Sequence, residues 1–412
     1  MSNKDQKRHP IVMVSLDAVS DGNVDYLLTC PNFSRLARLG LLHRQVDSIL
    51  VTSTYPVHTC INTGLMPCDH GVFDNTFQDS VKGTEVWRDH KRFIKGKTLP
   101  ERAYEHGLRT CAMMYPMTAG EKIRYHMTEI PGRSNLAYRV MKSAYYGSAG
   151  FMMHCMLKYG KHIIKDGERG MDMLIAKTGA DLIRKNKADL YMLHLLDVDT
   201  CKHNHGATSK EATEALGRID ECLGHLLAAM ESVGMENFEI LIFSDHSSLD
   251  IKEDLHPNEL LTARGFSLQD VHFHTTHGCA FLYISPTASD KLKQDVDDFI
   301  KEFLQMDAVS RELSAEEMRL CGATGDGFCR GFSAKPGYEL GKYRKGQHGY
   351  PMDPEYEDFK IFYLEIGNQA SKAAAEAGDA VEDVDGVSQV HGGCIIEVGK
   401  KAIDLIESTP KK

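Results

Sequence analysis

The sequence predicts an α/β fold, with a mostly parallel central sheet, helices on both faces and a smaller inserted cap subdomain. Short apolar runs alternate with stretches of helical periodicity through most of the 412 residues. Several runs are apolar at every position, as strands are when both faces of a sheet are covered. Polar residues follow some of these runs, where the carboxyl ends of parallel strands meet. At 42% hydrophobic and 26% charged residues, the chain can bury a full core.

Hydrophobic periodicity predicts the individual strands and helices. Apolar runs bounded by turn residues predict strands at Ile11–Leu16, Thr110–Met114, Leu190–Leu196, Phe238–Phe243, Ala280–Ile284 and Ile361–Ile366. Stretches with helical spacing of apolar residues predict helices at Thr98–His106, Asp172–Lys185, Lys210–Val233 and Ala288–Leu304. Buried strands separated by helices are typical of a parallel sheet covered on both faces.

Two parts of the chain depart from this alternation of strands and helices: the cap and the segment Ala137–Ile164. Residues 8–248 and 346–410 are predicted to form the catalytic core, and residues 249–345, which contain the Gly-rich stretch Gly322–Gly331, to form the cap. Ala137–Ile164 is rich in Met and Tyr and is predicted to be helical. It is expected either to cover a site or to form a contact in a homo-oligomer.

Charge and cysteine usage exclude several classes of protein. A net charge of −10 argues against a binder of nucleic-acid polymers or of a membrane surface, because both need a positive field. The 11 cysteines are odd in number and include no CxxC pair, which favours reduced thiols. The N-terminus carries no long apolar stretch with a cleavage signature. We therefore expect a soluble, cytoplasmic protein.

Carboxylates follow three of the predicted strands. Asp17 ends the first strand, Asp197 and Asp199 follow the third, and Asp245 with His246 follows the fourth. A single Asp at such a position is usually a turn or helix-capping residue. Three strand ends with carboxylates, two of them with histidines nearby, favour a shared polar site instead.

The spacing of these residues suits metal ions. Asp199 and His203 are one helical turn apart, so both can face one ion. Asp245 and His246 are adjacent after a strand, and His348 lies between glycines in Gly-Gln-His-Gly-Tyr. Together with the Asp of the first strand, these residues provide three carboxylates and three imidazoles. That set suits borderline divalent metals such as Zn²⁺ and is large enough for two neighbouring sites.

Structural interpretations of the same residues remain open. An Asp and a His four residues apart are often a solvated helix face, and a Gly-His-Gly loop is often only a turn. A further cluster, His272, His274 and His277, is predicted to lie on an exposed strand face of the cap.

A hydroxyl-rich loop provides the candidate nucleophile. The segment Val51–His58 contains Thr52, Ser53 and Thr54, and Thr59–Gly64 fits the start of a helix. Backbone N–H groups at a helix N-terminus attract anionic phosphoryl oxygens. One of the three hydroxyls could instead be the helix N-cap, and composition alone does not decide between these roles.

The order of these motifs resembles the alkaline phosphatase superfamily and, more narrowly, the type I phosphodiesterase/nucleotide pyrophosphatase family. That family has a strand-end Asp, then T-F-P-N-H, T-G-x-x-P-x-x-H-G-x-x-x-N, P-D-S-x-G-H, S-D-H-G and G-x-H-G-Y. In the same order, this chain has Asp17, Thr54-Tyr-Pro, Thr63-Gly-Leu-Met-Pro-Cys-Asp-His-Gly-Val-Phe-Asp-Asn75, Asp199-Thr-Cys-Lys-His203-Asn-His-Gly206, Ser244-Asp-His246 and Gly346-Gln-His-Gly-Tyr350. Each motif is weak alone, but their shared order is specific.

The resemblance implies an alkaline-phosphatase-like fold with two divalent metal ions, most often Zn²⁺, with Mn²⁺ or Fe as alternatives. One metal would be held by Asp199, His203 and His348. The other would be held by Asp17, Asp245, His246 and the oxygen of Thr54.

The resemblance also implies the reaction. The protein would hydrolyse a phosphodiester or pyrophosphate bond of a small molecule such as a nucleotide, through a phosphothreonine intermediate on Thr54. Asn75, with the backbone N–H of Thr54, would bind a phosphoryl oxygen. Tyr55 stands where family members have the Phe that they use near the leaving group, which implies a role in substrate binding.

Departures from the family pattern leave alternatives open. Ala18, Val57 and Val198 replace a Gly, an Asn and a Pro of the family motifs. These changes leave the predicted metal ligands in place but alter residues expected to lie near the nucleotide pocket. The first alternative is phosphonoacetate hydrolase, which breaks a C–P bond and uses lysines for which Lys122 is the nearest candidate here. The second is a non-catalytic, metal-stabilised binding protein.

Overall fold

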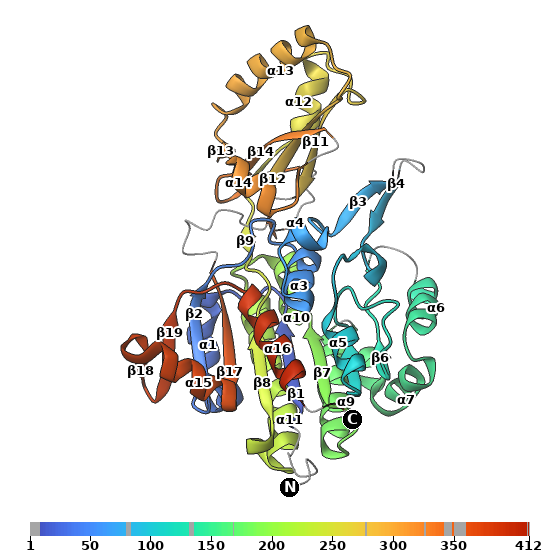
Figure 1. The fold of residues 1–412 in the computed structure, drawn as a ribbon, viewed down its shortest axis with the longest axis vertical. Coiled ribbons are helices and arrows are strands. Elements are labelled where there is room, and N and C mark those ends of the chain that lie inside the picture. Colours follow the sequence, from blue (N-terminus) through green and yellow to red (C-terminus); the bar gives the residue numbers. More distant parts are fainter. Residues whose placement is uncertain are drawn as a thin grey trace.

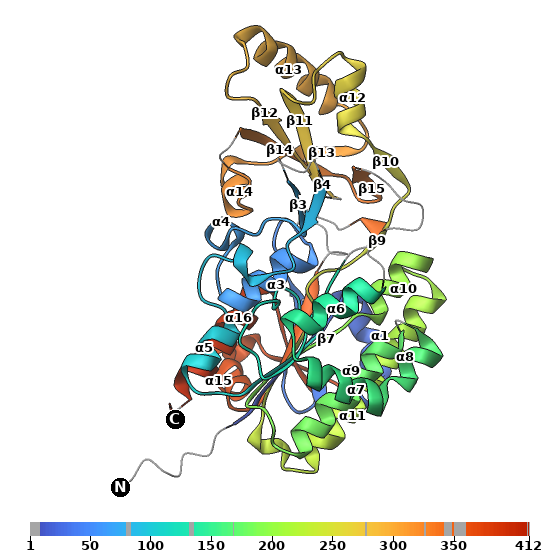
Figure 2. The ribbon, with the colours of Figure 1, turned by 90° about the vertical axis from the view of Figure 1, so that its right-hand side faces the viewer.

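The computed structural model describes residues 9–79, 84–131, 136–167, 169–276, 278–324, 327–341, 348–349, 360–409 and 411. Figure 1 shows a large α/β core with a smaller sheet and its helices lying at one end of it. The view turned by 90° shows the core sheet with helices on either side (Figure 2).

The central sheet has the strand order β18-β19-β2-β17-β8-β1-β7-β5-β6 within the part of the chain that the structure describes. β1 pairs in parallel with both β7 and β8, and β5 pairs in parallel with β6 and β7. β17 is antiparallel to both of its neighbours. The strands are β1 (Ile11–Leu16), β2 (Leu41–Val46), β5 (Thr110–Met113), β6 (Tyr125–Met127), β7 (Leu190–Leu195), β8 (Glu239–Phe243), β17 (Ile361–Ile366), β18 (Glu382–Val384) and β19 (Val387–His391).

Helices cover both faces of this sheet. Packed clusters place α1 (Val24–Thr29), α2 (Pro31–Ala37), α9 (Arg169–Arg184) and α11 (Lys210–Glu231) on one face. The opposite face carries α3 (Thr54–Thr63), α5 (Leu99–Glu105) and α16 (Ile396–Ser408). The remaining core helices are α4 (Pro67–His70), α10 (Asp197–His205) and α15 (Asn368–Ala377). The predicted fold class, a mostly parallel sheet with helices on both faces, is confirmed.

The sequence of β1 shows why the strand is buried on both sides. Val12, Val14 and Leu16 point into the cluster on one face of the sheet, whereas Ile11 and Met13 point into the other. Alternate residues of a strand face opposite sides, so an uninterrupted apolar run fills both layers. The predicted strand bounds agree with the structure to within one residue because turn residues end each run.

The register of the central strands places their carboxyl ends at the same edge. Val14 of β1 lies opposite Leu193 of β7 on one side and opposite Ile242 of β8 on the other. The polar residues that follow these three strands therefore lie close together, as expected for a parallel sheet.

The second sheet has the order β11-β12-β14-β13 and packs against α12 and α13 around its own apolar cluster. Its strands are β11 (Val271–Thr276), β12 (Cys279–Ile284), β13 (Val309–Glu312) and β14 (Phe328–Ala334), and its helices are α12 (Pro257–Ala263), α13 (Asp290–Phe303) and α14 (Ala315–Leu320). Short pairings involve β3 (Thr76–Asp79) with β4 (Thr84–Trp87), β10 (Glu253–Leu255) with β15 (Tyr338–Leu340), and β9 (Leu249–Asp250) with β16 (His348–Gly349). The division at residues 249 and 345 stays a prediction. We refer to β11–β14 with α12–α14 as the cap sheet.

The Met- and Tyr-rich segment consists of three helices rather than one long helix: α6 (Leu136–Tyr146), α7 (Ala149–Tyr159) and α8 (Lys161–Asp166). The chain bends at Gly147 and Gly160, where an added Cβ would lie 2.7 Å and 2.4 Å from a backbone carbonyl oxygen. Ser143 of α6 donates to the carbonyl of Thr128, which anchors the segment beside β6. Its predicted role in covering a site or in an oligomer contact stays a prediction.

Two further properties concern the cysteines and the helices. All eleven cysteines are free thiols, as their spacing predicted. Among the described residues, none of the helices has both the length and the apolar character needed to cross a membrane.

Candidate active site

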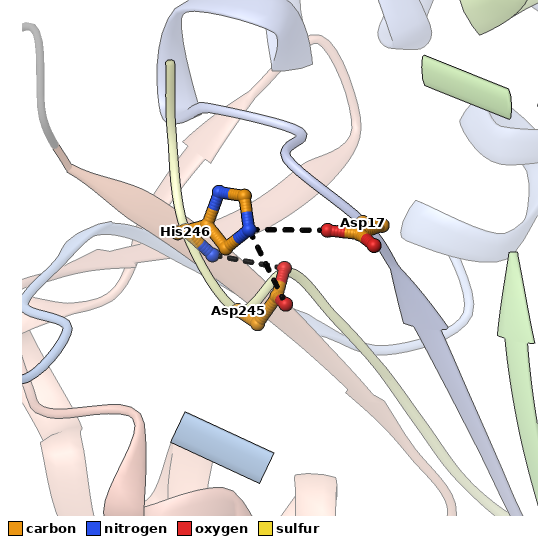
Figure 3. A group of neighbouring side chains, drawn as sticks. All are labelled: Asp17, Asp245 and His246. Atoms are coloured by element: carbon orange, nitrogen blue, oxygen red, sulfur yellow. Dashed lines mark hydrogen bonds and ion pairs between the residues drawn. The ribbon is translucent and has the colours of Figure 1, made fainter. Parts of the chain in front are cut away.

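Three of the predicted ligands form one buried cluster at the carboxyl edge of the central sheet (Figure 3). Asp17 follows β1, and Asp245 and His246 follow β8. His246 Nε2 lies 3.2 Å from Asp17 Oδ1 and 3.7 Å from Asp245 Oδ2. The three ligand atoms lie within 4.8 Å of one another. The register of β1 with β8 brings Asp17 next to Asp245 and His246, although more than half of the chain separates them.

The two carboxylates of this cluster stabilise positive charge, which favours a bound cation in place of the proton on His246. His246 Nδ1 lies 3.0 Å from the carbonyl oxygen of Ser247, so in the neutral ring Nδ1 donates and the Nε2 lone pair faces the carboxylates. Burial and the charge of Asp199 raise the pKa of Asp17 to about 6, and burial with the charge of Asp17 raises that of Asp245. Burial opposes protonation of His246, but the two carboxylates outweigh it and raise its pKa to about 9. Asp245 Oδ2 accepts no hydrogen bond. These residues therefore fit a divalent metal.

The turn after β1 is held in a rare backbone conformation. Ala18 has a φ of 60°, and its N–H donates to Asp245 Oδ1 at 3.3 Å. The buried Lys202 of α10 donates to the carbonyl of Ala18 at 2.7 Å and to Asn23 at 3.0 Å. These contacts fix the direction in which the Asp17 side chain leaves the strand.

The second predicted pair lies on α10. Asp199 Oδ2 is 3.3 Å from His203 Nε2, so the two side chains meet across one helical turn as the sequence predicted. Asp197 points elsewhere, because its Oδ2 accepts from Arg218 Nε at 2.5 Å. Asp172 of α9 accepts the backbone N–H groups of residues 196 and 197 and so holds the start of α10.

His348 is placed only in part. Its backbone pairs with Asp250 in β9, which begins three residues after His246. Asp250 in turn accepts the N–H of Ala207, just after α10, at 2.6 Å. The side chain of His348 lies outside the described residues, so its predicted role as a ligand stays a prediction.

The predicted nucleophile lies beside the metal-ligand cluster. Thr54 is the first residue of α3, and Ser53 occupies the N-cap position without a capping hydrogen bond from its side chain. Thr54 Oγ1 lies 3.3 Å from His246 Nε2. In the first turn Pro56 has no N–H and the N–H of Tyr55 bonds to Asn75, while the N–H of Thr54 has no acceptor within its helix. An anion bound there would meet both the hydroxyl and this N–H group.

Asn75 is held on three sides next to Thr54. Its side-chain Oδ1 accepts the N–H of Tyr55 at 2.8 Å, so its NH₂ group is the end left to meet a ligand. Its backbone N–H donates to Asp74 Oδ1 at 2.7 Å, and its carbonyl accepts the N–H of Arg88 at 2.9 Å. The predicted oxygen-binding residue is therefore a rigid donor.

Tyr55 is deeply buried. Its side chain is 1% exposed and packs with Val72 and Met117. Its ring lies edge-to-face with Trp87, with ring centroids 5.8 Å apart, and Trp87 is 37% exposed. Tyr55 thus packs against the partly exposed Trp87. Its own predicted contact with substrate stays a prediction.

Two buried histidines beneath the cluster were not predicted from the sequence. His194 of β7 places Nε2 3.2 Å from Asp17 Oδ2, and its ring lies edge-to-face with His58, 4.7 Å away. His58 Nδ1 donates to the carbonyl of Thr54 at 2.8 Å and lies 3.5 Å from Asp245 Oδ2. Burial lowers the pKa of His194 to about 4 and that of His58 to about 3, so both are neutral. The signal available for His194 was a polar residue within an otherwise apolar strand, and that for His58 was its place in the motif that begins at Thr54.

Comparison with known proteins fits this geometry. Residues 11–320 match the sequence model of the family described as type I phosphodiesterase / nucleotide pyrophosphatase. The chain belongs to this family. The matched residues include the strand-end cluster and Thr54 but end before His348.

Curated relatives agree with this assignment. Ectonucleotide pyrophosphatase/phosphodiesterase family member 1 of Rattus norvegicus is 26% identical over 249 residues, which cover 58% of this chain and 24% of that protein. Venom phosphodiesterase 1 of Crotalus adamanteus is 22% identical over 259 residues, which cover 60% of this chain and 26% of that protein. The match thus spans about a quarter of the length of these relatives.

Solved structures share the fold. The chain superposes on murine ectonucleotide pyrophosphatase/phosphodiesterase 5, an inactive form in complex with AMP, with a TM-score of 0.64 and 16% identity. The alignment covers 98% of this chain and 96% of that one. The human counterpart gives the same TM-score and identity. The core is therefore alkaline-phosphatase-like.

Proposed function

We propose that this protein is a metal-dependent hydrolase that cleaves phosphodiester or pyrophosphate bonds of small molecules through a covalent intermediate on Thr54. The observation that carries the proposal is the position of Thr54 at the N-terminus of α3. Its hydroxyl lies 3.3 Å from His246 Nε2, and the amide of Asn75 lies next to the same helix turn. A hydroxyl, an amide donor and a cluster of side chains that fits a metal ion support this proposal by their proximity.

The residues would divide between two metal sites. Asp17, Asp245 and His246 would hold one divalent ion with the Thr54 oxygen, and Asp199 and His203 would hold the other with His348. When bound, such ions stabilise negative charge on the attacking and leaving oxygens and lower the pKa of a coordinated hydroxyl. Zn²⁺ suits this set of carboxylates and imidazoles, and Mn²⁺ or Fe would also accept it.

The chain's own residues would carry the remaining chemistry. Thr54 Oγ1 would bond to phosphorus while the bond to the leaving oxygen breaks, leaving a phosphothreonine that keeps the second ester group. Water would then attack phosphorus and break its bond to Thr54 Oγ1, which restores the threonine hydroxyl. The NH₂ group of Asn75 and the N–H of Thr54 would donate to the phosphoryl oxygen, which gains charge in both transition states.

Surroundings of the site support a small-molecule substrate. Trp87 presents an exposed indole next to Tyr55, which offers a stacking surface for a base or another aromatic group. We therefore propose a nucleotide or an aryl diester as substrate. A net charge of −10 argues against binding of nucleic-acid polymers or membranes, which carry negative charge themselves. The eleven free thiols support a cytoplasmic location. A homo-oligomer remains a separate proposal for the helices α6–α8.

The test is hydrolysis of bis-p-nitrophenyl phosphate and of p-nitrophenyl phosphate by the zinc- or manganese-loaded protein and by its Thr54→Ala variant. We expect a preference for the diester that the variant loses while it keeps its metal. Phosphonoacetate, assayed by phosphate release, is the third substrate. Cleavage of phosphonoacetate without diester hydrolysis would replace the proposed activity with C–P bond cleavage, and metal binding without any turnover would indicate a binding protein.

A further inference from the structure

Three consecutive residues connect the active site to the cap sheet. Asn75 faces the nucleophile, while the two residues before it, Phe73 and Asp74, face β11, β12 and β14. In Figure 1 the cap sheet lies at the same end of the core as α4 and the β3–β4 hairpin, which flank this run. The position of Asn75 therefore depends on a contact made some 200 residues further along the chain.

The carboxylate of Asp74 makes this connection with both of its oxygens. Oδ1 accepts the backbone N–H of Asn75 at 2.7 Å, and Oδ2 accepts from Nε2 of His274, on β11, at 2.8 Å. The Asp74 side chain is 8% exposed and that of His274 is 20% exposed. A buried carboxylate bonded in this way is held in one orientation, and removal of either partner leaves a desolvated acceptor.

Phe73 supports the same run by packing. Its ring lies 5.3 Å from that of His274, 6.4 Å from Phe281 and 6.2 Å from Phe328. On the other side, the guanidinium of Arg88 lies 5.2 Å above the Phe73 ring. These contacts fix the backbone on one side of Asp74. A displacement of Asp74 caused by a change in His274 should therefore move Asn75 and not Phe73.

The neighbouring His272 provides an internal comparison. It lies two residues earlier on the same strand, so its side chain leaves from the same face. It stacks on Tyr283 with ring centroids 4.6 Å apart, and its Nδ1 faces the carbonyl of Leu268. All of these contacts lie within residues 268–283, and none reaches the active-site loop. The prediction of an exposed strand face is thus wrong for His274, and His277 lies outside the described residues.

We infer that His274 is a positioning residue for the reaction, which holds the oxygen-binding Asn75 in place through Asp74. The inference rests on the proposed function, because Asn75 matters only if a phosphoryl oxygen is bound there. A donor aimed at charge that develops in the transition state acts on kcat more than on KM. A displacement of about 1 Å at such a donor can cost about 10²-fold in rate.

The test compares His274→Phe, which keeps the ring and loses the donor, with His274→Gln, whose amide N–H can replace Nε2. We expect His274→Phe to lower kcat for bis-p-nitrophenyl phosphate by about 10- to 100-fold, with KM changed by less than about threefold. His274→Gln should recover most of this loss. His272→Phe, the matched control on the same strand, should leave kcat unchanged.

A double-mutant cycle separates positioning from general destabilisation. If His274 acts through Asn75, then Asn75→Ala with His274→Phe should be no slower than Asn75→Ala alone. Additive losses, or equal losses in His272→Phe and His274→Phe, would overturn the inference. The failure of the proposed function would look different, because the unsubstituted protein would itself show no diester hydrolysis.

Discussion

The active site has two sides that are built in different ways. The floor consists of Asp17, Asp245 and His246, which follow two parallel strands, with His194 of β7 and His58 of α3 beneath them, and all five are buried within the core. The wall consists of Thr54 and the run Phe73–Asn75, which lie on a helix start and a loop backed by the cap sheet.

This difference separates two physical roles. Side chains on the floor are fixed by strand register and by a core packed on both faces, so they suit a function that tolerates little movement, such as holding metal ions. The wall depends on side-chain hydrogen bonds between segments distant in sequence. The wall is therefore the part that more readily accommodates changes in substrate binding. The departures of Tyr55 and Val57 from the family pattern lie beside it, buried in the helix that begins at Thr54.

The largest effect is expected from a substitution in the floor. Asp245→Asn removes one ligand charge, and we expect loss of bound metal together with a fall in turnover of at least about 10³-fold, since a metal at such a site supplies several kcal/mol of charge stabilisation. Metal content by mass spectrometry and diester hydrolysis measure the two effects. Asp189→Asn, at the opposite end of β7 where Asp189 pairs with Arg109, serves as the control and should keep both. Full metal occupancy in Asp245→Asn would contradict the ligand assignment.

The next largest effect is expected from a substitution in the wall. Asn75→Ala removes the donor to the phosphoryl oxygen, and we expect kcat to fall by about 10²–10³-fold while metal content stays unchanged. Steady-state kinetics with bis-p-nitrophenyl phosphate, together with metal analysis, distinguishes this from a floor defect. An unchanged kcat would show that the wall does not touch the transition state.

A subtler change tests the support beneath the floor. His194→Phe keeps the ring volume but removes the nitrogen 3.2 Å from Asp17 Oδ2. Outer residues that orient metal ligands typically contribute about 10–100-fold to metal affinity, and we expect a loss in that range. Competition with a chromophoric chelator measures it, with His225→Phe on α11 as control. Equal affinities in the two variants would show that Asp17 needs no such support.

The smallest effect concerns pH and the loop that leads into the wall. His70 accepts the N–H of Val72 at 3.1 Å, and burial lowers its pKa to about 3. Below about pH 6.5 the unfolded chain binds a proton that folded His70 excludes, so stability falls as pH decreases from 6.5 toward 3. At pH 5 this costs about 2 kcal/mol relative to pH 8. Urea unfolding at both pH values should show a smaller difference for His70→Gln; an identical pH dependence in the two proteins would contradict the assignment.

Strand ends and hydroxyl placement were accessible from the sequence because they are local. Asp17, Asp245 and His246 follow apolar runs directly, and Thr54 stands at the start of a helical pattern. The only sign of His194 in the sequence was a polar residue within an apolar strand. Its partner in space comes from a strand that lies far away in the chain, so periodicity could not reveal the contact.

The contact between the wall and the cap sheet was harder to predict for the same reason. His274 and Asp74 are 200 residues apart, and nothing around His274 distinguishes it from His272. The difference between them is a matter of how the cap sheet lies on the core, which local pattern does not encode. The division of Ala137–Ile164 into three helices was likewise hidden, because the bends at Gly147 and Gly160 depend on close approaches to carbonyl groups.

The proposed mechanism requires that Thr54 attacks phosphorus before water does. Hydrolysis of one diastereomer of a chiral phosphorothioate diester in heavy-oxygen water tests this directly, because each in-line displacement inverts the configuration at phosphorus. Two successive displacements, at Thr54 and then by water, predict net retention of configuration. Net inversion would show that water attacks the substrate in a single step, and would contradict the role given to Thr54.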